Sequence, residues 1–213
     1  MAKRLFVTGT DTDAGKTHIS CAILAHLGRM GQQVAGLKPI ASGGRDDAER
    51  LWRHSTLQLH LDSHNPFYFA PPIAPHLAAG EAGVSLDVAK VLAAMAPWQH
   101  QQADWLLMEG AGGWRVPLNE TEGFADLAKA WGGGVILVVG MKLGCVNHAL
   151  LSAEAIGRDG LELIGWVANC GLGPMDRLDE NLAYLERHLG APLLARAGHQ
   201  PDPAAIEVNW HPC

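Results

Sequence analysis

A glycine-rich stretch near the start of the chain constrains the fold more than any other feature of the sequence. Residues 9–17 read Gly-Thr-Asp-Thr-Asp-Ala-Gly-Lys-Thr. They follow the apolar run 5–7, which predicts a buried strand, and they lead into residues 16–30, where apolar side chains recur at helical spacing. A glycine-rich turn between a strand and a helix directs backbone N–H groups and the helix N-terminus at one point, where an anion binds. The stretch therefore predicts a phosphate-binding loop.

The chemistry of this loop favours a nucleoside triphosphate with Mg²⁺. Gly15 lets the backbone bend toward phosphate oxygens, Lys16 is expected to reach the β and γ phosphates, and the Thr17 hydroxyl is expected to coordinate the metal. The motif is one residue longer than the usual pattern between Gly9 and Gly15. The strand–loop–helix context nevertheless fits. The predicted nucleotide-binding residues of the loop are Gly9, Thr10, Asp11, Thr12, Asp13, Ala14, Gly15, Lys16 and Thr17.

Strand and helix patterns alternate along the rest of the chain. Further strands are predicted at 33–37, 105–108, 135–139, 164–168 and from 192, and helices at 46–59, 86–95, 124–131, 147–158 and 176–188. Residues 65–75, rich in proline and aromatic residues, predict an ordered loop. The strands lack polar alternation, which indicates a parallel sheet covered on both faces. We expect a three-layer α/β fold of the P-loop NTPase type, in one domain over residues 1–213 with 198–213 as a surface tail.

Composition argues against several other classes of protein. The 213 residues carry a net charge of −6 and no basic stripe, which disfavours nucleic acid as a partner. The longest apolar run, 133–140, is far shorter than the ~20 residues that cross a membrane, and no signal peptide is evident. Four scattered cysteines are typical of reduced thiols. The expected location is the cytoplasm.

Two charged residues follow predicted strands at the edge where the phosphate loop lies. Glu109 ends the apolar strand 105–108, and the carboxyl ends of parallel strands gather ligands, so Glu109 is a candidate second Mg²⁺ ligand. A glutamate that simply ends a strand before a glycine-rich turn, without binding a metal, would show the same pattern. Lys38 follows strand 33–37 and either faces a substrate or is solvated; position alone favours neither.

Several motifs in order give the chain a resemblance to the dethiobiotin synthetase family, over nearly its whole length to about Leu194. The motifs are 7–12 with 15–17, 36–43, 65–66, 75–76, 109–114, 135–140, 142–149 and 165–169. The longer phosphate loop is the form that this family uses. The resemblance implies an ATP-dependent ligase that joins 7,8-diaminononanoate and CO₂ into dethiobiotin, releasing ADP and phosphate, with Mg²⁺ as cofactor. A carbamate and a carbamic-phosphoric anhydride are the implied intermediates.

The resemblance also implies roles for individual residues. Lys16 and Lys38 would supply positive charge to anionic intermediates, with the Thr12 and Ser42 hydroxyls as donors. Asp13 occupies the position of a family acid near the diamine. The implied ligands of Mg²⁺ are Thr17, Asp47 and Glu109.

A second group of implied residues lies later in the chain. In the family, the segment that matches Gly144, Cys145, Val146 and Asn147 binds the substrate carboxylate at a two-fold dimer interface. A carboxylate suits this segment because the N–H groups at a helix N-terminus bind anions. A homodimer is therefore implied. Asn169 resembles the family residue that reads the nucleotide base. The sequence departs from the family after Leu194, where it reads Ala-Arg-Ala-Gly-His, so base selectivity stays open.

Three rival interpretations fit the sequence less well. Nucleotide-dependent switches that partition DNA or place division sites carry an extra lysine five residues before the phosphate lysine, and that position is Asp11. Amidases acting on corrin precursors carry a glutaminase domain, for which 213 residues leave no room. An inactive homologue would lack some of Lys16, Thr17, Lys38 and Glu109, and all four are present.

Overall fold

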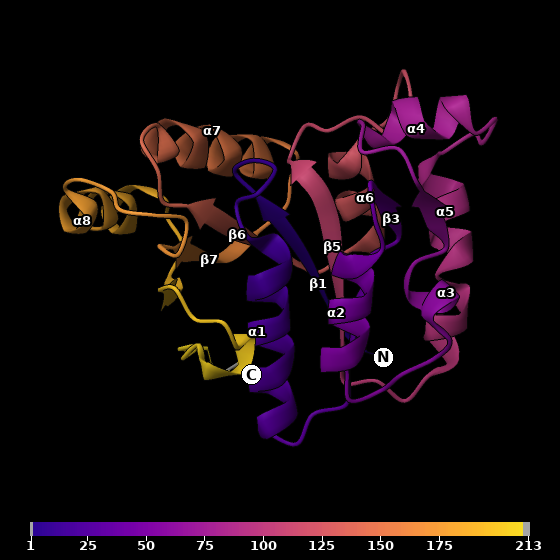
Figure 1. Ribbon diagram of the computed structural model, residues 1–213, viewed down its shortest axis with the longest axis horizontal. Helices are drawn as coiled ribbons and strands as arrows, with labels where there is room; N and C mark the ends of the chain where they lie inside the picture. Colours follow the sequence, from indigo (N-terminus) through magenta and orange to yellow (C-terminus); the bar gives the residue numbers. More distant parts are fainter. Residues whose placement is uncertain (1, 211–213) are drawn as a thin grey trace.

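The computed structural model describes residues 2–210 and shows a six-stranded, all-parallel sheet in the order β2-β5-β1-β6-β7-β8 (Figure 1). Its strands are β1 (Lys3–Gly9), β2 (Val34–Leu37), β5 (Trp105–Gly113), β6 (Gly134–Gly140), β7 (Leu163–Asn169) and β8 (Leu193–Ala197). The apolar runs that lacked polar alternation are these strands; β2, β5, β1, β6 and β7 are largely buried on both sides, whereas the edge strand β8 exposes Arg196. The predicted parallel sheet is confirmed.

Helices cover both faces of this sheet. They are α1 (Lys16–Arg29), α2 (Asp46–His54), α3 (Leu61–His64), α4 (Pro75–Glu81), α5 (Val88–Ala94), α6 (Phe124–Trp131), α7 (Cys145–Arg158) and α8 (Leu178–His188), with short 3₁₀ turns η1 (Ala96–His100) and η2 (Pro203–Ala205). Successive residues of β1 point to opposite faces. Leu5 and Val7 pack with α1 and α2, whereas Phe6 packs with α5 and α6.

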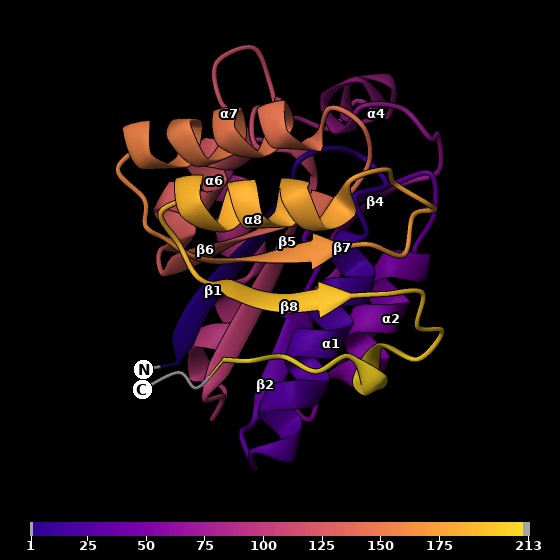
Figure 2. The same ribbon diagram turned by 90° about the vertical axis from the view of Figure 1, so that its left-hand side faces the viewer.

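Helices α7 and α8 cover β6 and β7 on the second face, so the architecture has three layers (Figure 2). Val135, Leu137 and Val139 of β6 point toward that face, while Ile136 and Val138 point toward α1. The predicted three-layer α/β class is confirmed. Within the described residues, no helix combines the length and the apolar character needed to cross a membrane.

The region between α2 and α5 differs from the prediction. Residues 67–69 lie in the predicted ordered loop, yet they form β4 (Phe67–Phe69), which pairs in parallel with β3 (Ile40–Ser42) in a second, two-stranded sheet. The helix predicted over 46–59 ends at His54, and the short helices α3 and α4 were not predicted. Elements of three to seven residues are too short to show a clear period in the sequence.

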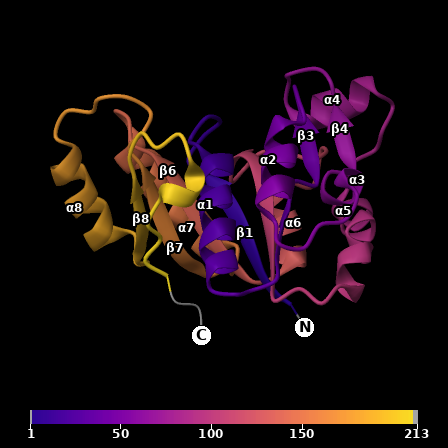
Figure 3. The ribbon, with the colours of Figure 1, turned by 60° about the horizontal axis from the view of Figure 1, so that its bottom comes forward.

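The segment after β8 runs back along α1, as the yellow ribbon shows beside the indigo helix (Figure 3). Ile206 and Val208 are buried in the same apolar cluster as the inner face of α1. Arg29 Nη1 donates to the carbonyl oxygen of Ala204 at 2.9 Å, and the Asn209 N–H donates to that of Leu194 at 2.7 Å. The predicted surface tail is thus packed against the outside of α1 up to residue 210; residues 211–213 lie outside the described part.

Candidate active site

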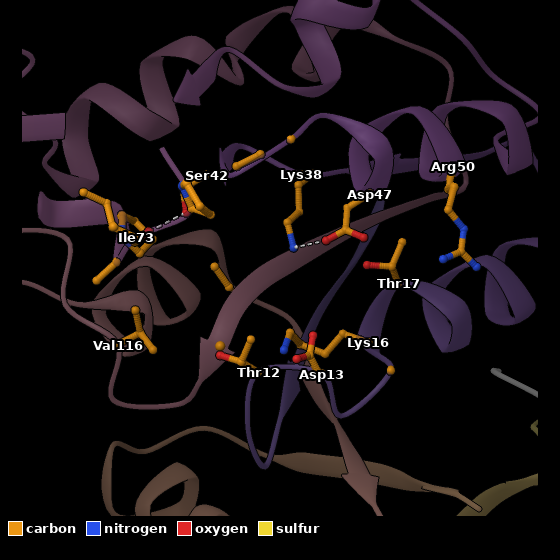
Figure 4. A pocket seen from close by; sticks show the side chains of 18 residues that line it. Thr12, Asp13, Lys16, Thr17, Lys38, Ser42, Asp47, Arg50, Ile73 and Val116 are labelled. Carbon is orange, nitrogen blue, oxygen red and sulfur yellow. Dashed lines mark hydrogen bonds and ion pairs between the residues drawn. The ribbon is translucent and has the colours of Figure 1, made fainter. Parts of the chain in front are cut away.

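A cavity of about 680 Å³ opens at the carboxyl ends of β1, β2 and β5 (Figure 4). This is the edge at which parallel α/β sheets bind ligands, because loops from several strands meet there. Its lining brings together eight of the predicted site residues, with three more that were not predicted. They are Thr12, Asp13, Gly15, Lys16, Thr17, Lys38, Ser42 and Asp47, together with Arg50, Ile73 and Val116.

The phosphate loop has the backbone geometry that phosphate binding requires. Gly15 adopts φ 89°, a left-handed conformation, and is the N-cap of α1, so the first helical N–H groups stay available to an anion. A Cβ atom on Gly15 would collide with the side-chain amide of Asn169. The loop is anchored to the sheet at two points: Asn169 Nδ2 donates to the carbonyl oxygen of Ala14 at 2.9 Å, and the Gly140 N–H donates to Thr10 Oγ1 at 3.3 Å.

Lys16 is a buried cation that no carboxylate pairs directly among the described residues. Its ammonium group donates to the carbonyl oxygen of Asp11 at 2.9 Å. Burial, and after it the nearby charge of Lys38, lower the pKa of Lys16 to about 8. An anion bound at this point would stabilise the charged lysine, so the loop is electrostatically suited to phosphate.

Strand register explains why Lys38 lies beside Glu109. Leu37 is paired with Met108, so the next residues of β2 and β5 reach the sheet edge at the same level. Lys38 Nζ lies 2.7 Å from Glu109 Oε1 and donates to the carbonyl oxygen of Gly110 at 2.9 Å. Lys38 Nζ also lies 3.4 Å from Asp47 Oδ2. Burial alone would lower the pKa of Lys38, but the Glu109 and Asp47 carboxylates outweigh burial and raise it.

Two of the three predicted metal ligands, Thr17 and Asp47, line the cavity, whereas Glu109 is fully buried behind Thr17. Both oxygens of Glu109 already accept hydrogen bonds, Oε1 from Thr17 and Lys38 and Oε2 from Ser20. The Asp47 side chain is 48% exposed and faces the cavity. The described residues contain no cluster of three His, Cys, Asp or Glu side chains able to hold a metal by themselves. Mg²⁺ commonly takes one or two carboxylates, waters and substrate phosphates, so this donor set fits a nucleotide-bound Mg²⁺.

The end of the cavity away from the phosphate loop is more apolar. Ile73, Val116 and the neighbouring prolines line it, and Ser42 Oγ donates to the carbonyl oxygen of Ile73 at 2.8 Å. Asp13, in the left-handed region with φ 60°, is exposed and lines the same cavity with Thr12. This end of the cavity therefore has a largely apolar wall with few free polar groups.

The structure does not bring the segment Gly144–Asn147 into this cavity. The four residues form the start of α7, and none of them, all within the described chain, lines the cavity. Burial raises the pKa of the Cys145 thiol, so it is no ready nucleophile. One link joins this segment to the phosphate loop: Lys142 Nζ lies 3.1 Å from Asp11 Oδ2, and that hydrogen bond holds the pKa of Asp11 below its usual range.

Sequence reasoning missed two residues that the structure adds to the site. Ser20 follows Thr17 by three residues on α1 and holds the second oxygen of Glu109. Arg50 follows Asp47 by three residues on α2 and lines the cavity. Residues three apart on a helix share a face, so helical spacing from the predicted metal ligands was the signal that could have found both.

Comparison with known proteins gives three concordant results. A family profile described as an AAA domain matches residues 3–205. The chain is 49% identical to an ATP-dependent dethiobiotin synthetase from Pseudomonas aeruginosa (strain UCBPP-PA14), covering 96% of this chain and 94% of that protein. It is 45% identical to ATP-dependent dethiobiotin synthetase 1 from Escherichia coli O157:H7, covering 96% of each chain.

Solved structures with little sequence identity share the fold. The septum site-determining protein MinD of Pyrococcus horikoshii, complexed with Mg-ADP, superposes with a TM-score of 0.57 at 14% identity, over 94% of this chain and 83% of that one. The cell division protein FtsY of Thermotoga maritima gives a TM-score of 0.55 at 14% identity, over 98% and 65%. These likenesses place the chain among P-loop NTPase folds.

Proposed function

This chain belongs to the dethiobiotin synthetase family and is an ATP-dependent ligase of biotin biosynthesis, and on that premise we propose that it converts 7,8-diaminononanoate, CO₂ and ATP into dethiobiotin, ADP and phosphate. The observation that carries the proposal is the wall of the cavity. Lys16 of the phosphate loop and Lys38 both line it, and its other end is apolar. A reaction that passes a phosphoryl group to a bound carbamate requires this arrangement of positive charge.

The proposed reaction proceeds in three steps. One amine of the substrate attacks CO₂, forms a C–N bond and loses a proton, which gives a carbamate. A carbamate oxygen attacks the γ-phosphorus of ATP, and ADP leaves with the electrons of the broken P–O bond. The second amine then attacks the carbonyl carbon of the mixed anhydride, phosphate leaves, and the cyclic urea is closed with loss of a second proton.

The chain's own residues contribute charge and position to these steps. Lys38, whose raised pKa keeps it protonated, cannot act as a base and instead stabilises the carbamate and the transferring phosphoryl group. Lys16 is proposed to hold the β and γ phosphates. The hydroxyls of Thr12 and Ser42 are proposed as donors to the carbamate, and Asp13 to hold the diamine through its charge.

Mg²⁺ is proposed to bind with the nucleotide through Thr17, Asp47 and Glu109, where it would neutralise phosphate charge. Asp47 supports this role because its carboxylate lies at the cavity surface, with a pKa that burial would raise but that Lys38 and Thr17 lower. Glu109 supports it through Thr17, since the glutamate accepts the hydrogen bond of the threonine hydroxyl at 2.7 Å.

The substrate carboxylate is proposed to bind at Gly144–Asn147 of a second copy of the chain, in a two-fold homodimer. The exposure of Leu143, at 95%, and of Leu151, at 57%, on and beside α7 supports an interface here. Each copy is proposed to be a single domain that carries the phosphate loop and the two lysines, with Asn169 beside the nucleotide base. The free thiols Cys21, Cys145 and Cys170 are compatible with the proposed cytoplasmic location.

Mass spectrometry of the products tests the proposal. The purified protein is given Mg-ATP, bicarbonate and 7,8-diaminononanoate, and the expected product is heavier than the diamine by one carbonyl and lighter by two hydrogens, with one ADP formed for each. A Lys16→Ala variant should give no product. ADP release that ignores the diamine would instead favour a nucleotide switch.

A further inference from the structure

Arg50 lines the active-site cavity, yet none of the roles above includes it. It lies on α2, one turn after Asp47, and its half-buried side chain faces α1. There Arg50 Nη2 lies 3.2 Å from Nδ1 of His18, the residue that directly follows Thr17. The guanidinium group is therefore held at the side of the phosphate loop, beside the predicted Mg²⁺ ligands.

Within the described part of the chain Arg50 forms no direct ion pair, although its charge acts on the nearby carboxylate of Asp47. Among residues 2–210 no Asp or Glu forms an ion pair with it, although Asp46 and Asp47 lie on the same helix. Its hydrogen-bond partner on α1 is the imidazole of His18 and not a carboxylate. Arg53, one turn further along α2, differs: it is 63% exposed and pairs with Glu49 at 2.9 Å.

A half-buried guanidinium beside a polar cavity favours an anionic ligand, because such a cation is costly to desolvate without a counter-charge. Its five N–H donors form a fork that matches phosphate oxygens, and one of them, on Nη2, meets His18. The remaining donors are free to meet an anion that enters the cavity. Arg50 thus has the chemistry of a phosphate-binding residue.

The position of Arg50 indicates which phosphates it meets. In Figure 4, Ser42, Ile73 and Val116 lie at one end of the cavity and Arg50 at the other, with Lys16, Thr17, Lys38 and Asp47 between them. In the proposed function the carbamate occupies the end near Ser42, so the γ-phosphate points toward that end. The phosphates that remain with the nucleoside must then extend toward Thr17, His18 and Arg50.

We propose that Arg50 binds the diphosphate part of the nucleotide, the part that leaves as ADP, and so sets nucleotide affinity without taking part in phosphoryl transfer. The inference rests on the proposed placement of ATP in this cavity. Because the contact is the same before and after transfer, Arg50 contributes equally to the binding of ATP and of ADP. Uniform binding of this kind changes KM for ATP and leaves kcat unchanged.

Titration calorimetry with Mg-ADP, and with Mg-ATP in the absence of diamine, tests the inference. Arg50→Gln keeps a donor for His18 but removes the charge, and we expect both Kd values to rise roughly tenfold, the loss of one charge-assisted hydrogen bond to phosphate. Arg50→Lys, which keeps the charge, should recover part of the affinity. Arg53→Gln on the same helix is the matched control and should bind both nucleotides as the natural chain does.

Steady-state kinetics and thermal unfolding separate binding from a structural role. With Arg50→Gln, KM for ATP should rise while kcat and the KM for the diamine stay within about twofold, and the Tm without nucleotide should stay unchanged. An unchanged Kd for ADP would overturn the inference, as would a loss confined to ATP. Failure of the natural chain to convert the diamine, with Arg50-dependent ADP binding intact, would refute the ligase reaction and leave the role of Arg50 standing.

Discussion

The ammonium group of Lys38 lies 2.7 Å from the carboxylate of Glu109, with the two side chains 5% and 0% exposed. The pair joins the ends of β2 and β5 and orders the wall of the cavity on which the proposed chemistry depends. The carboxylate has a second function, since it also accepts hydrogen bonds from Thr17 and Ser20 of α1. Lys38, the proposed metal ligand Thr17 and helix α1 are therefore all held by one buried glutamate.

Replacing Lys38 with methionine should separate chemistry from nucleotide binding. The change leaves Glu109 charged and buried without its partner, so the free energy of unfolding should fall by about 3–5 kcal/mol, measured by urea denaturation. Product formation should be nearly abolished while Mg-ADP still binds, because the phosphate loop is unaltered. The double variant Lys38→Met/Glu109→Gln should recover stability but not turnover. A near-normal rate in Lys38→Met would remove the proposed role of Lys38.

Gly15 is predicted to tolerate no side chain. Its φ of 89° is unfavourable for alanine, and a Cβ atom would strike the Asn169 amide that holds the loop to β7. Gly15→Ala should weaken Mg-ADP binding by about 100-fold or more, measured by calorimetry, since the loop must move. Gly31 is the matched control: its φ is 79°, but nothing lies within 4 Å of the added atom. Gly31→Ala should cost about 1 kcal/mol of stability and leave nucleotide affinity unchanged.

Nucleotide binding should depend on the protonation of Lys16. Its pKa is lowered from 10.5 to about 8 in the ligand-free protein, and bound phosphate should raise it again. Binding of ADP should therefore take up a proton near pH 8, and affinity should fall as pH rises above that value. Calorimetry in buffers of different ionisation enthalpy measures the uptake. Lys16→Arg, charged at every accessible pH, should lose this dependence; the same pH profile in that variant would contradict the assignment.

The same lowered pKa has an opposite consequence for the stability of the ligand-free chain. Between pH 8 and 10.5 the unfolded chain binds more protons at Lys16 than the folded chain does. Stability contributed by this group therefore rises with pH across that window, whereas nucleotide affinity falls. Lys16→Met removes both effects, so urea unfolding of this variant at pH 7.5 and 9.5 provides the comparison.

Much of the fold could be predicted from the sequence because long elements show clear periods. The strand 135–139 and the helix 16–30 were found within two residues of their ends, since fully buried strands are continuous apolar runs and α1 has apolar residues at helical spacing. The pair β3 and β4 could not be found in this way. Their three-residue strands are defined only by the pairing of residues 40–42 with residues 67–69, which are distant in the chain.

The same distinction between local pattern and tertiary contact applies to the residues of the site. Lys16 and Thr17 follow from local motif chemistry, and Glu109 from its place after an apolar strand. That Lys38 pairs with Glu109 depends on the register of β2 against β5, a relation between residues 71 apart in the chain that no local pattern contains. Arg50 was missed because an arginine on a helix is usually a solvated surface residue. Its place in the cavity wall, one turn after Asp47, shows that it faces the site.

The proposed homodimer makes a prediction about Leu143, which is 95% exposed on the isolated chain. A large apolar side chain so exposed, next to the helix start proposed to bind substrate carboxylate, suits a buried interface. Leu143→Glu places a charge there, so light scattering should show a monomer where the natural chain is a dimer. KM for the diamine should rise at least about tenfold, because the partner's carboxylate site is lost. Mg-ADP affinity should stay unchanged, since the phosphate loop belongs to one chain.

Met30→Glu, at a 44% exposed position at the far end of α1, should alter none of these quantities. A Leu143→Glu protein that stays dimeric, or a natural chain that is fully active as a monomer, would place the substrate carboxylate site within a single chain.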